Sequence, residues 1–111
     1  MPKRRRPEER FLDAVVDAAE LLGWRCMHVP DGIHNRRIPK TGVGFPDLVL
    51  LQGRDVLWRE LKTDKGRVSE AQAAWGAALI DAGEDWAVWR PKDWPAIEMQ
   101  LRALGRHDDA G

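Results

Sequence analysis

Two apolar runs separated by a glycine-bearing turn dominate the hydrophobic pattern of the chain. The first occupies residues 44–51, the second residues 56–62, and Gln52-Gly53-Arg54-Asp55 connects them. Branched aliphatic and aromatic residues on both sides of such a turn predict paired antiparallel strands. With Gly53 and Arg54 as the central turn residues, the register of the whole hairpin follows.

This register brings charged residues together at the open end of the hairpin. It sets Asp47 directly opposite Glu60, and like charges in that position are destabilising. Lys62 follows Glu60 by two residues, so strand alternation puts both on one face. Two carboxylates and an amine at one end of an apolar hairpin predict a site for a divalent cation.

Apolar residues at helical spacing predict helices around these strands. Ser69 and Gln72 match a capping box, with Ser69 as N-cap, and Asp93 is the expected cap of the last helix. The predicted helices span residues 7–22, 70–82 and 94–104. Two further strands are predicted at 24–29 and 86–89. The order α-β-β-β-α-β-α predicts an α/β fold, a mixed sheet flanked by helices.

The domain organisation follows from the same pattern and from the length of 111 residues, which suits one small core. We expect a basic arm at residues 1–6, one domain at 7–105 and a frayed tail at 106–111. Residues 30–43 form a polar loop punctuated by glycine and proline. Such long loops are usually functional or disordered.

Composition narrows the class of protein. No apolar run approaches the roughly 20 residues that cross a bilayer, and no apolar stretch follows the basic N-terminus, so we expect neither membrane span nor secretory signal. The single cysteine, Cys26, excludes an internal disulfide framework and a multi-cysteine zinc site, which fits a reducing cytoplasm. The six Trp residues suit the core, although Trp24 or Trp94 could stack on a nucleobase.

The formal net charge of zero conceals an asymmetry. Residues 1–67 carry 14 Lys and Arg against 10 Asp and Glu, whereas residues 68–111 carry 4 against 8. A polyanion such as DNA would therefore bind beside the hairpin. Basic residues around the hairpin are the candidates for phosphate contacts: Arg36, Arg37, Lys40, Lys65 and Arg67. The run Lys3–Arg6 is either a binding arm or a solvated tail.

The acid pair suits magnesium chemistry. Mg²⁺ prefers oxygen ligands, often one or two carboxylates with waters and phosphate oxygens. Asp47 and Glu60 supply such a pair, and the backbone carbonyl of Leu61 could add an oxygen. Lys62 could orient or deprotonate an attacking water. Taken singly, Gly-Phe-Pro-Asp can be a mere turn and Glu60–Lys62 an ion pair, but the combination favours a metal site.

The motifs Gly44-Phe45-Pro46-Asp47 and Glu60-Leu61-Lys62 resemble the Asp…Glu-x-Lys signature of restriction-endonuclease-like nucleases. With Gly66-Arg67-x-Ser69-x-x-Gln72 added, the chain is most similar to the VRR-NUC family, in particular to its short stand-alone members in phages and bacteria. The resemblance covers residues 8–94. It implies an α-β-β-β-α-β core with an extra C-terminal helix here, and Mg²⁺- or Mn²⁺-dependent phosphodiester hydrolysis.

The resemblance also implies roles for single residues. It makes Asp47 and Glu60 metal ligands and Lys62 the catalytic lysine. An acid near the start of the first helix would support the metal site, which favours Glu8, with Glu9 as the alternative; either could instead complement the helix dipole.

Two further positions match the family less closely. Gln72 matches a glutamine near the active site, but it is also the expected capping partner of Ser69, and we expect these two roles to need different rotamers. His28 matches a histidine after the first strand, where it would contact nucleic acid, or it could be structural.

These observations predict a metal-dependent DNA endonuclease, an enzyme selective for DNA structure such as a branch or Holliday junction. Relatives of this size imply a homodimer. We expect a cytoplasmic location, in the bacterial host cell if the protein is phage-encoded. The alternative is a nuclease-like module that binds nucleic acid without cutting. A third possibility is an accessory protein in which the site holds a structural ion only.

Overall fold

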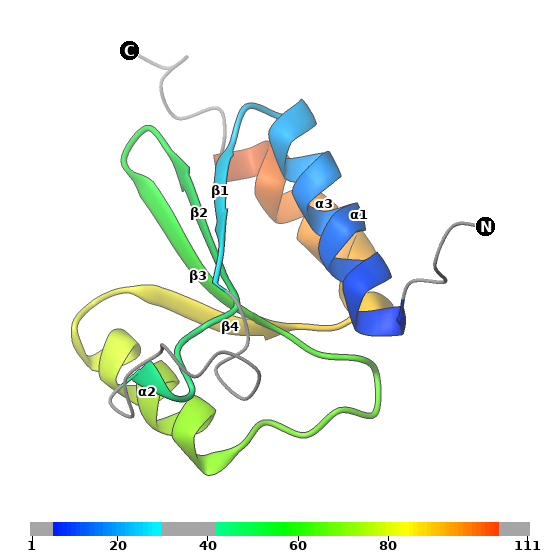
Figure 1. The fold of residues 1–111 in the computed structure, drawn as a ribbon. Helices are drawn as coiled ribbons and strands as arrows, with labels where there is room; N and C mark the ends of the chain where they lie inside the picture. Colours follow the sequence, from blue (N-terminus) through cyan, green and yellow to red (C-terminus); the bar gives the residue numbers. More distant parts are fainter. Residues whose placement is uncertain (1–5, 30–41, 105–111) are drawn as a thin grey trace.

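Four strands form one mixed sheet in the spatial order β1-β2-β3-β4 (Figure 1). In the computed structural model, which describes residues 6–29 and 42–104, the strands are β1 (Arg25–His28), β2 (Leu48–Gln52), β3 (Asp55–Leu61) and β4 (Asp85–Trp89). The first three strands pair antiparallel, whereas β3 and β4 pair parallel. The predicted mixed sheet is confirmed.

The β2–β3 hairpin has the predicted register. Gln52 pairs with Asp55 beside the turn, and the ladder keeps this register to its last pair. The next outward step sets Asp47 opposite Glu60, just beyond the point where the ladder ends. The end of the hairpin therefore carries the predicted acid pair.

Helices cover both faces of the sheet. Within the described residues they are α1 (Pro7–Leu21), α2 (Glu70–Asp81), the 3₁₀ turn η2 (Pro91–Asp93) and α3 (Trp94–Leu104). Figure 1 shows α1 and α3 on one face and α2 on the other. The predicted α-β-β-β-α-β order with a further helix is confirmed. None of the helices in this part of the chain is both long and apolar enough to cross a membrane.

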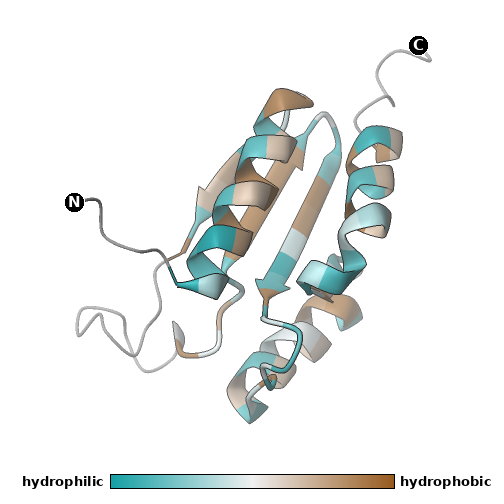
Figure 2. Ribbon diagram, turned by 90° about the vertical axis from the view of Figure 1, so that its right-hand side faces the viewer, coloured by the Kyte–Doolittle hydropathy of each residue, from teal (hydrophilic) through white to brown (hydrophobic). Residues whose placement is uncertain are grey.

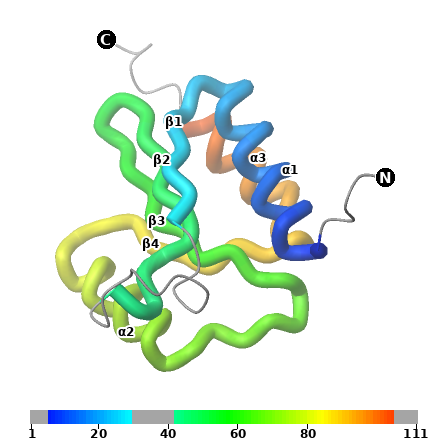
Figure 3. The backbone as a smooth tube through the Cα atoms, in the orientation of Figure 1, coloured from blue at the N-terminus to red at the C-terminus, as the bar shows by residue number. Residues whose placement is uncertain are grey.

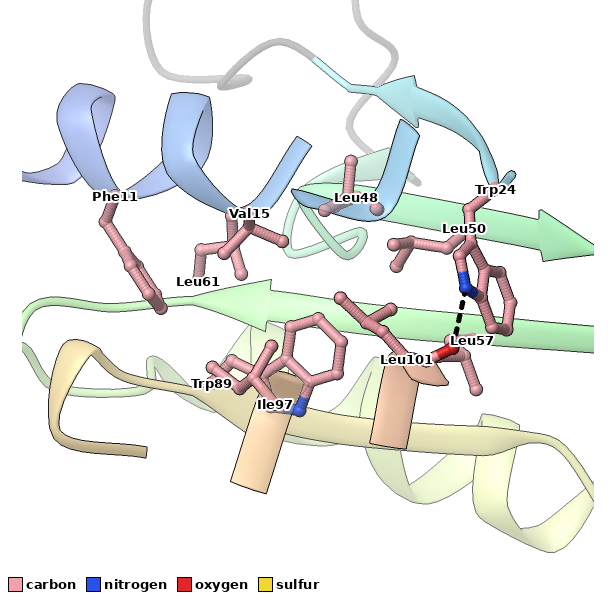
Figure 4. Packing of buried hydrophobic residues seen from close by; sticks show 11 residues of the cluster. Phe11, Val15, Trp24, Leu48, Leu50, Leu57, Leu61, Trp89, Ile97 and Leu101 are labelled. Atoms are coloured by element: carbon pink, nitrogen blue, oxygen red, sulfur yellow. Dashed lines mark hydrogen bonds between the residues drawn. The ribbon is translucent and has the colours of Figure 1, made fainter. Parts of the chain in front are cut away.

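One hydrophobic core fills the space between the sheet and the α1–α3 pair (Figure 4). α1 contributes Phe11, Val15 and Ala19, which share a face because they recur every four residues. Figure 2 shows polar and apolar residues along α1 and α3, and both apolar and polar stretches along the strands. The other buried apolar residues are Trp24, Leu48, Leu50, Leu57, Leu61, Trp89, Ile97 and Leu101.

The tryptophans that could have stacked on a base belong to the core. Trp24 is only 3% exposed. Its indole Nε1 donates to the carbonyl of Leu101 over 3.1 Å and so ties the start of β1 to α3 (Figure 4). Trp94 packs against the same core. The structure therefore favours the structural interpretation of both residues.

A buried arginine joins the parallel pair β3 and β4, which the sequence analysis did not anticipate. Arg59 is 1% exposed, and its Nη2 lies 2.9 Å from Asp85 Oδ1. Its Nη1 donates to the Asp85 carbonyl over 2.6 Å, and its guanidinium lies 4.8 Å from the centre of the Trp89 ring. Burial lowers the pKa of Arg59, and the Asp85 carboxylate opposes that shift. These contacts compensate the cost of burying the charge.

α2 begins and ends as its sequence predicts. The Ser69 hydroxyl accepts the Gln72 N–H over 3.1 Å, and Gln72 Oε1 accepts the Ser69 N–H over 2.8 Å, which completes the capping box. At the other end, Gly83 adopts a φ of +87° in a Schellman motif, where a residue without Cβ avoids strain.

The predicted cap of the last helix is wrong in detail. Asp93 does not start α3 as an isolated cap, because the helical turn η2 begins at Pro91 and runs directly into α3. Asp93 Oδ2 instead accepts the Arg90 N–H over 3.0 Å, at the start of η2. A proline at the first helical position favours this earlier start because its φ is already helical.

Candidate active site

Asp47 is held at the start of β2 by both neighbouring strands. Its backbone carbonyl accepts the Val29 N–H over 2.7 Å. Its Oδ2 accepts the Leu61 N–H over 2.9 Å, so beyond the last β2–β3 pair the side chain takes over contact with β3. One carboxylate oxygen is fixed in this way, while the other can bind a cation.

Glu60 is the second acid, and it is buried. The residue is 1% exposed, and its Oε1 accepts a hydrogen bond from Gln72 Nε2 over 3.0 Å. A carboxylate in so little water is costly unless hydrogen bonds and a positive charge compensate it. A divalent cation shared with Asp47 would supply that charge.

Gln72 bonds to Ser69 and to Glu60 at the same time, so the expectation that capping and a place beside the acid pair need different rotamers is wrong. Its Oε1 accepts from the Ser69 N–H while its Nε2 donates to Glu60. Both bonds form together because an amide has an acceptor and a donor on separate atoms. The capping bond also fixes which atom of the amide faces Glu60.

Lys62 directly follows the strand that carries Glu60. It is half-buried, and its N–H donates to the Trp89 carbonyl over 3.0 Å, which continues the contact with β4. Strand alternation puts its side chain on the face of Glu60. By register and strand alternation, Asp47, Glu60 and Lys62 therefore lie on one face at the same end of the hairpin.

The donor set suits Mg²⁺ or Mn²⁺ better than a softer metal. Among residues 6–29 and 42–104, no group of three or more His, Cys, Asp and Glu side chains could hold a metal ion. Two carboxylates and a nearby carbonyl, that of Leu61, remain as hard oxygen donors. Mg²⁺ commonly binds to one or two carboxylates and keeps waters in its other positions.

The acids of the first helical turn do not complete a third ligand position. Phe11 of α1 lies near Leu61 (Figure 4), and Glu8, one turn before Phe11, is exposed. Glu9 pairs with Arg6 over 3.1 Å. A contribution of Glu8 through water stays a prediction.

The structure positions some of the predicted DNA contacts. Lys65 and Arg67 are exposed on the segment between β3 and α2, which Figure 3 traces from the end of β3 to the start of the helix. His28 is exposed at the end of β1, next to the residue that binds the Asp47 carbonyl. The other candidates lie outside the described residues: Arg36, Arg37 and Lys40.

A glycine of the Gly-Phe-Pro-Asp motif has a packing role that sequence analysis missed. Gly44 adopts a φ of +88°, and a Cβ there would lie 2.5 Å from the backbone carbon of Ala71. The segment that leads into β2 therefore lies directly against the first turn of α2. A glycine three residues before the acid was the available signal, but its contact with Ala71 is long-range.

Aromatic side chains pack around the residue that follows Gly44. The Phe45 ring packs edge-to-face against two tryptophans. The distance between ring centres is 5.0 Å for Trp75 and 6.0 Å for Trp58. Edge-to-face packing at such distances is favourable beyond the area it buries. The segment that leads into Asp47 is thus packed between α2 and β3.

The double role of Gln72 makes Gln72→Glu a sharp test of its bond to Glu60. Glutamate keeps the capping acceptor but replaces the donor Nε2 with an oxygen beside the Glu60 carboxylate. The new carboxylate and that of Glu60 would repel each other unless a cation lay between them. We expect a lower melting temperature than wild type in EDTA and a larger increase on adding Mg²⁺, measured by thermal denaturation.

Ser69→Ala is the matched control, because it removes the cap at a cost of about 0.5–2 kcal/mol without touching Glu60. Its melting temperature should fall equally with and without Mg²⁺. An equal Mg²⁺ response of Gln72→Glu and wild type would mean that the amide does not act on Glu60.

Comparison with known proteins supports the fold. A solved structure described as "VRR_NUC domain protein" matches this chain with a TM-score of 0.68 and 18% identity, covering 93% of this chain and 93% of that chain. No family profile and no curated protein matches the sequence significantly. At this identity the likeness is one of fold, and the predicted VRR-NUC fold is confirmed.

Proposed function

Because the chain shares its fold with a VRR_NUC domain protein, we propose that it is a metal-dependent DNA endonuclease that hydrolyses phosphodiester bonds. Fold alone does not determine an activity, so the proposal depends on the residues at the site. The observation that carries it is the hydrogen bond from the Leu61 N–H to Asp47 Oδ2. Leu61 separates Glu60 from Lys62, so this bond joins the first acid to the strand end that bears the second acid and the lysine.

Asp47 and Glu60 would hold Mg²⁺ or Mn²⁺, with the Leu61 carbonyl as a further oxygen. When bound, such an ion polarises a phosphate oxygen and lowers the pKa of a bound water. Gln72 would keep Glu60 oriented towards the ion through its bond of 3.0 Å. Glu8 would support the site through water.

Lys62 would act on the water and on the phosphate. Its amine can hold the attacking water or take its proton, and its charge can stabilise the negative charge that develops on phosphorus-bound oxygens. The water oxygen forms a new bond to phosphorus, the bond to one sugar oxygen breaks, and that oxygen takes up a proton.

Exposed basic residues would position the DNA. Lys65 and Arg67 flank the site on the β3–α2 segment, and His28 lies across β2 from it. Together with Arg36, Arg37 and Lys40 they would contact phosphates, which orients a substrate without reading its sequence. We therefore propose selectivity for DNA structure, such as a branch, and a homodimer that offers more surface than one small domain.

The experiment that tests this proposal is a panel of supercoiled, linear, nicked, flapped and four-way DNAs incubated with Mg²⁺, Mn²⁺ or EDTA. We expect cleavage only with the metals, and faster cleavage of one branched form than of linear DNA. Gel shift in EDTA measures binding separately from cutting.

Two results would contradict the enzyme. Binding that persists in EDTA while every DNA stays intact with both metals indicates a binding module. A melting temperature that falls on chelation without any effect of nucleic acid indicates a structural ion.

A further inference from the structure

Arg90, the residue directly after β4, binds the chain segment that follows Lys62. Its Nη1 lies 2.7 Å from the Thr63 carbonyl and 2.7 Å from the Gly66 carbonyl, with the Asp64 carbonyl at 3.5 Å. A guanidinium is well suited to this role, because its donors are rigid and always charged. One side chain at the end of β4 thus donates hydrogen bonds to three carbonyls of this segment.

Further bonds join the same two segments. Asp64 Oδ1 accepts the Lys92 N–H over 3.0 Å, and the Gly66 N–H closes the turn on the Thr63 carbonyl over 3.1 Å. Figure 3 shows the segment after β3 running alongside the chain that leaves β4. The conformation of residues 63–66, here called the β3–α2 turn, is therefore maintained by β4 and η2.

The β3–α2 turn links the proposed catalytic lysine to two of the proposed DNA-binding residues. It follows Lys62 directly, and both Lys65, within it, and Arg67, just after it, are exposed. A flexible turn would have to become ordered each time these two side chains met phosphates, which costs conformational entropy. A turn already held by Arg90 would avoid that cost.

We propose that Arg90 is a positioning residue for DNA, which acts through the β3–α2 turn by presenting Lys65 and Arg67 to the substrate phosphates. This inference rests on the proposed nuclease function. Arg90 itself touches backbone carbonyls, so its effect on DNA is indirect. It should change substrate affinity more than the rate of the chemical step.

The test compares Arg90→Met with Arg102→Met, which removes the same charge from an exposed position on α3. For Arg90→Met we expect KM for DNA to rise roughly tenfold with kcat nearly unchanged, as for lost ground-state binding. The slope of log binding constant against log salt, measured by gel shift in EDTA, should become shallower by about 1–2 as two phosphate contacts weaken. Arg102→Met should change none of these values.

Two further measurements separate positioning from direct contact. Hydrogen exchange at residues 63–67 should accelerate in Arg90→Met, and Arg90→Lys, which keeps the charge, should recover part of the protection. In a Lys65→Met/Arg67→Met background, Arg90→Met should leave the salt slope unchanged, because residues that act through one another are not additive. A shallower slope in that background would overturn the proposal, because it indicates that Arg90 contacts a phosphate itself. Unchanged exchange would also overturn it, because the turn would then keep its order without Arg90.

Failure of this inference differs from failure of the proposed function. Wild-type protein that neither binds nor cuts DNA would overturn both. If wild type cuts DNA while Arg90→Met keeps its KM and salt slope, only the role of Arg90 is overturned.

Discussion

Asp47→Asn is expected to lose metal-dependent DNA cleavage while keeping the fold. Changing groups that merely orient a metal ligand costs about 10–100-fold in affinity or activity, so losing the ligand charge should cost more than about 100-fold. The Asn carbonyl oxygen can still accept the Leu61 N–H that Asp47 Oδ2 binds at 2.9 Å. The melting temperature without metal should therefore stay close to that of wild type.

Asp47→Ala is the matched comparison, because it removes the charge and the acceptor together. The Leu61 N–H then loses its partner, and an unsatisfied buried donor costs about 1–3 kcal/mol. Both variants should be inactive on supercoiled plasmid, but only the alanine variant should unfold at a lower urea concentration than wild type. Cleavage by Asp47→Asn within tenfold of the wild-type rate would exclude Asp47 as an essential ligand.

Gly44→Ala should be the most destabilising single-methyl change among the described glycines that have a positive φ. A side chain at positive φ costs about 1–2 kcal/mol. The new Cβ would also lie 2.5 Å from backbone of α2, and displacing packed structure costs about 1–3 kcal/mol more. The sum, roughly 2–5 kcal/mol, is a large share of the 5–15 kcal/mol that stabilises a typical domain.

Gly83→Ala separates the two causes. Gly83 has a φ of +87°, like that of Gly44, but nothing lies within 4 Å of a Cβ there. Its free energy of unfolding, measured with urea, should fall by only about 1–2 kcal/mol. Equal losses in the two variants would show that the contact of Gly44 with α2 carries no energetic weight.

Local patterns predicted most of the backbone and the acidic pair. The hairpin register followed from the turn at Gly53 and from strand alternation, and the start of α2 followed from the spacing of Ser69 and Gln72. In both cases the physical cause lies within a few residues of its effect. The placement of Asp47, Glu60 and Lys62 at one end of the hairpin could therefore be predicted from the sequence.

Contacts between distant segments could not be predicted in this way. The pairing of Arg59 with Asp85 depends on which residue of β4 lies beside β3, a parallel register that no turn specifies. The bonds of Arg90 to the turn after Lys62 depend on the same register. In the sequence both arginines look like ordinary charged residues. Only the tertiary structure buries Arg59 and surrounds Arg90 with carbonyls.

Positions 47 and 72 should evolve under different pressures. At position 47, asparagine could still accept the Leu61 N–H, so in the proposed nuclease an acid there would be maintained by selection for metal binding. At position 72, one amide both starts α2 and supports Glu60. In the proposed nuclease, selection for stability and selection for activity would therefore act on the same atoms of Gln72, and a lineage that abandons catalysis could lose the aspartate long before the glutamine.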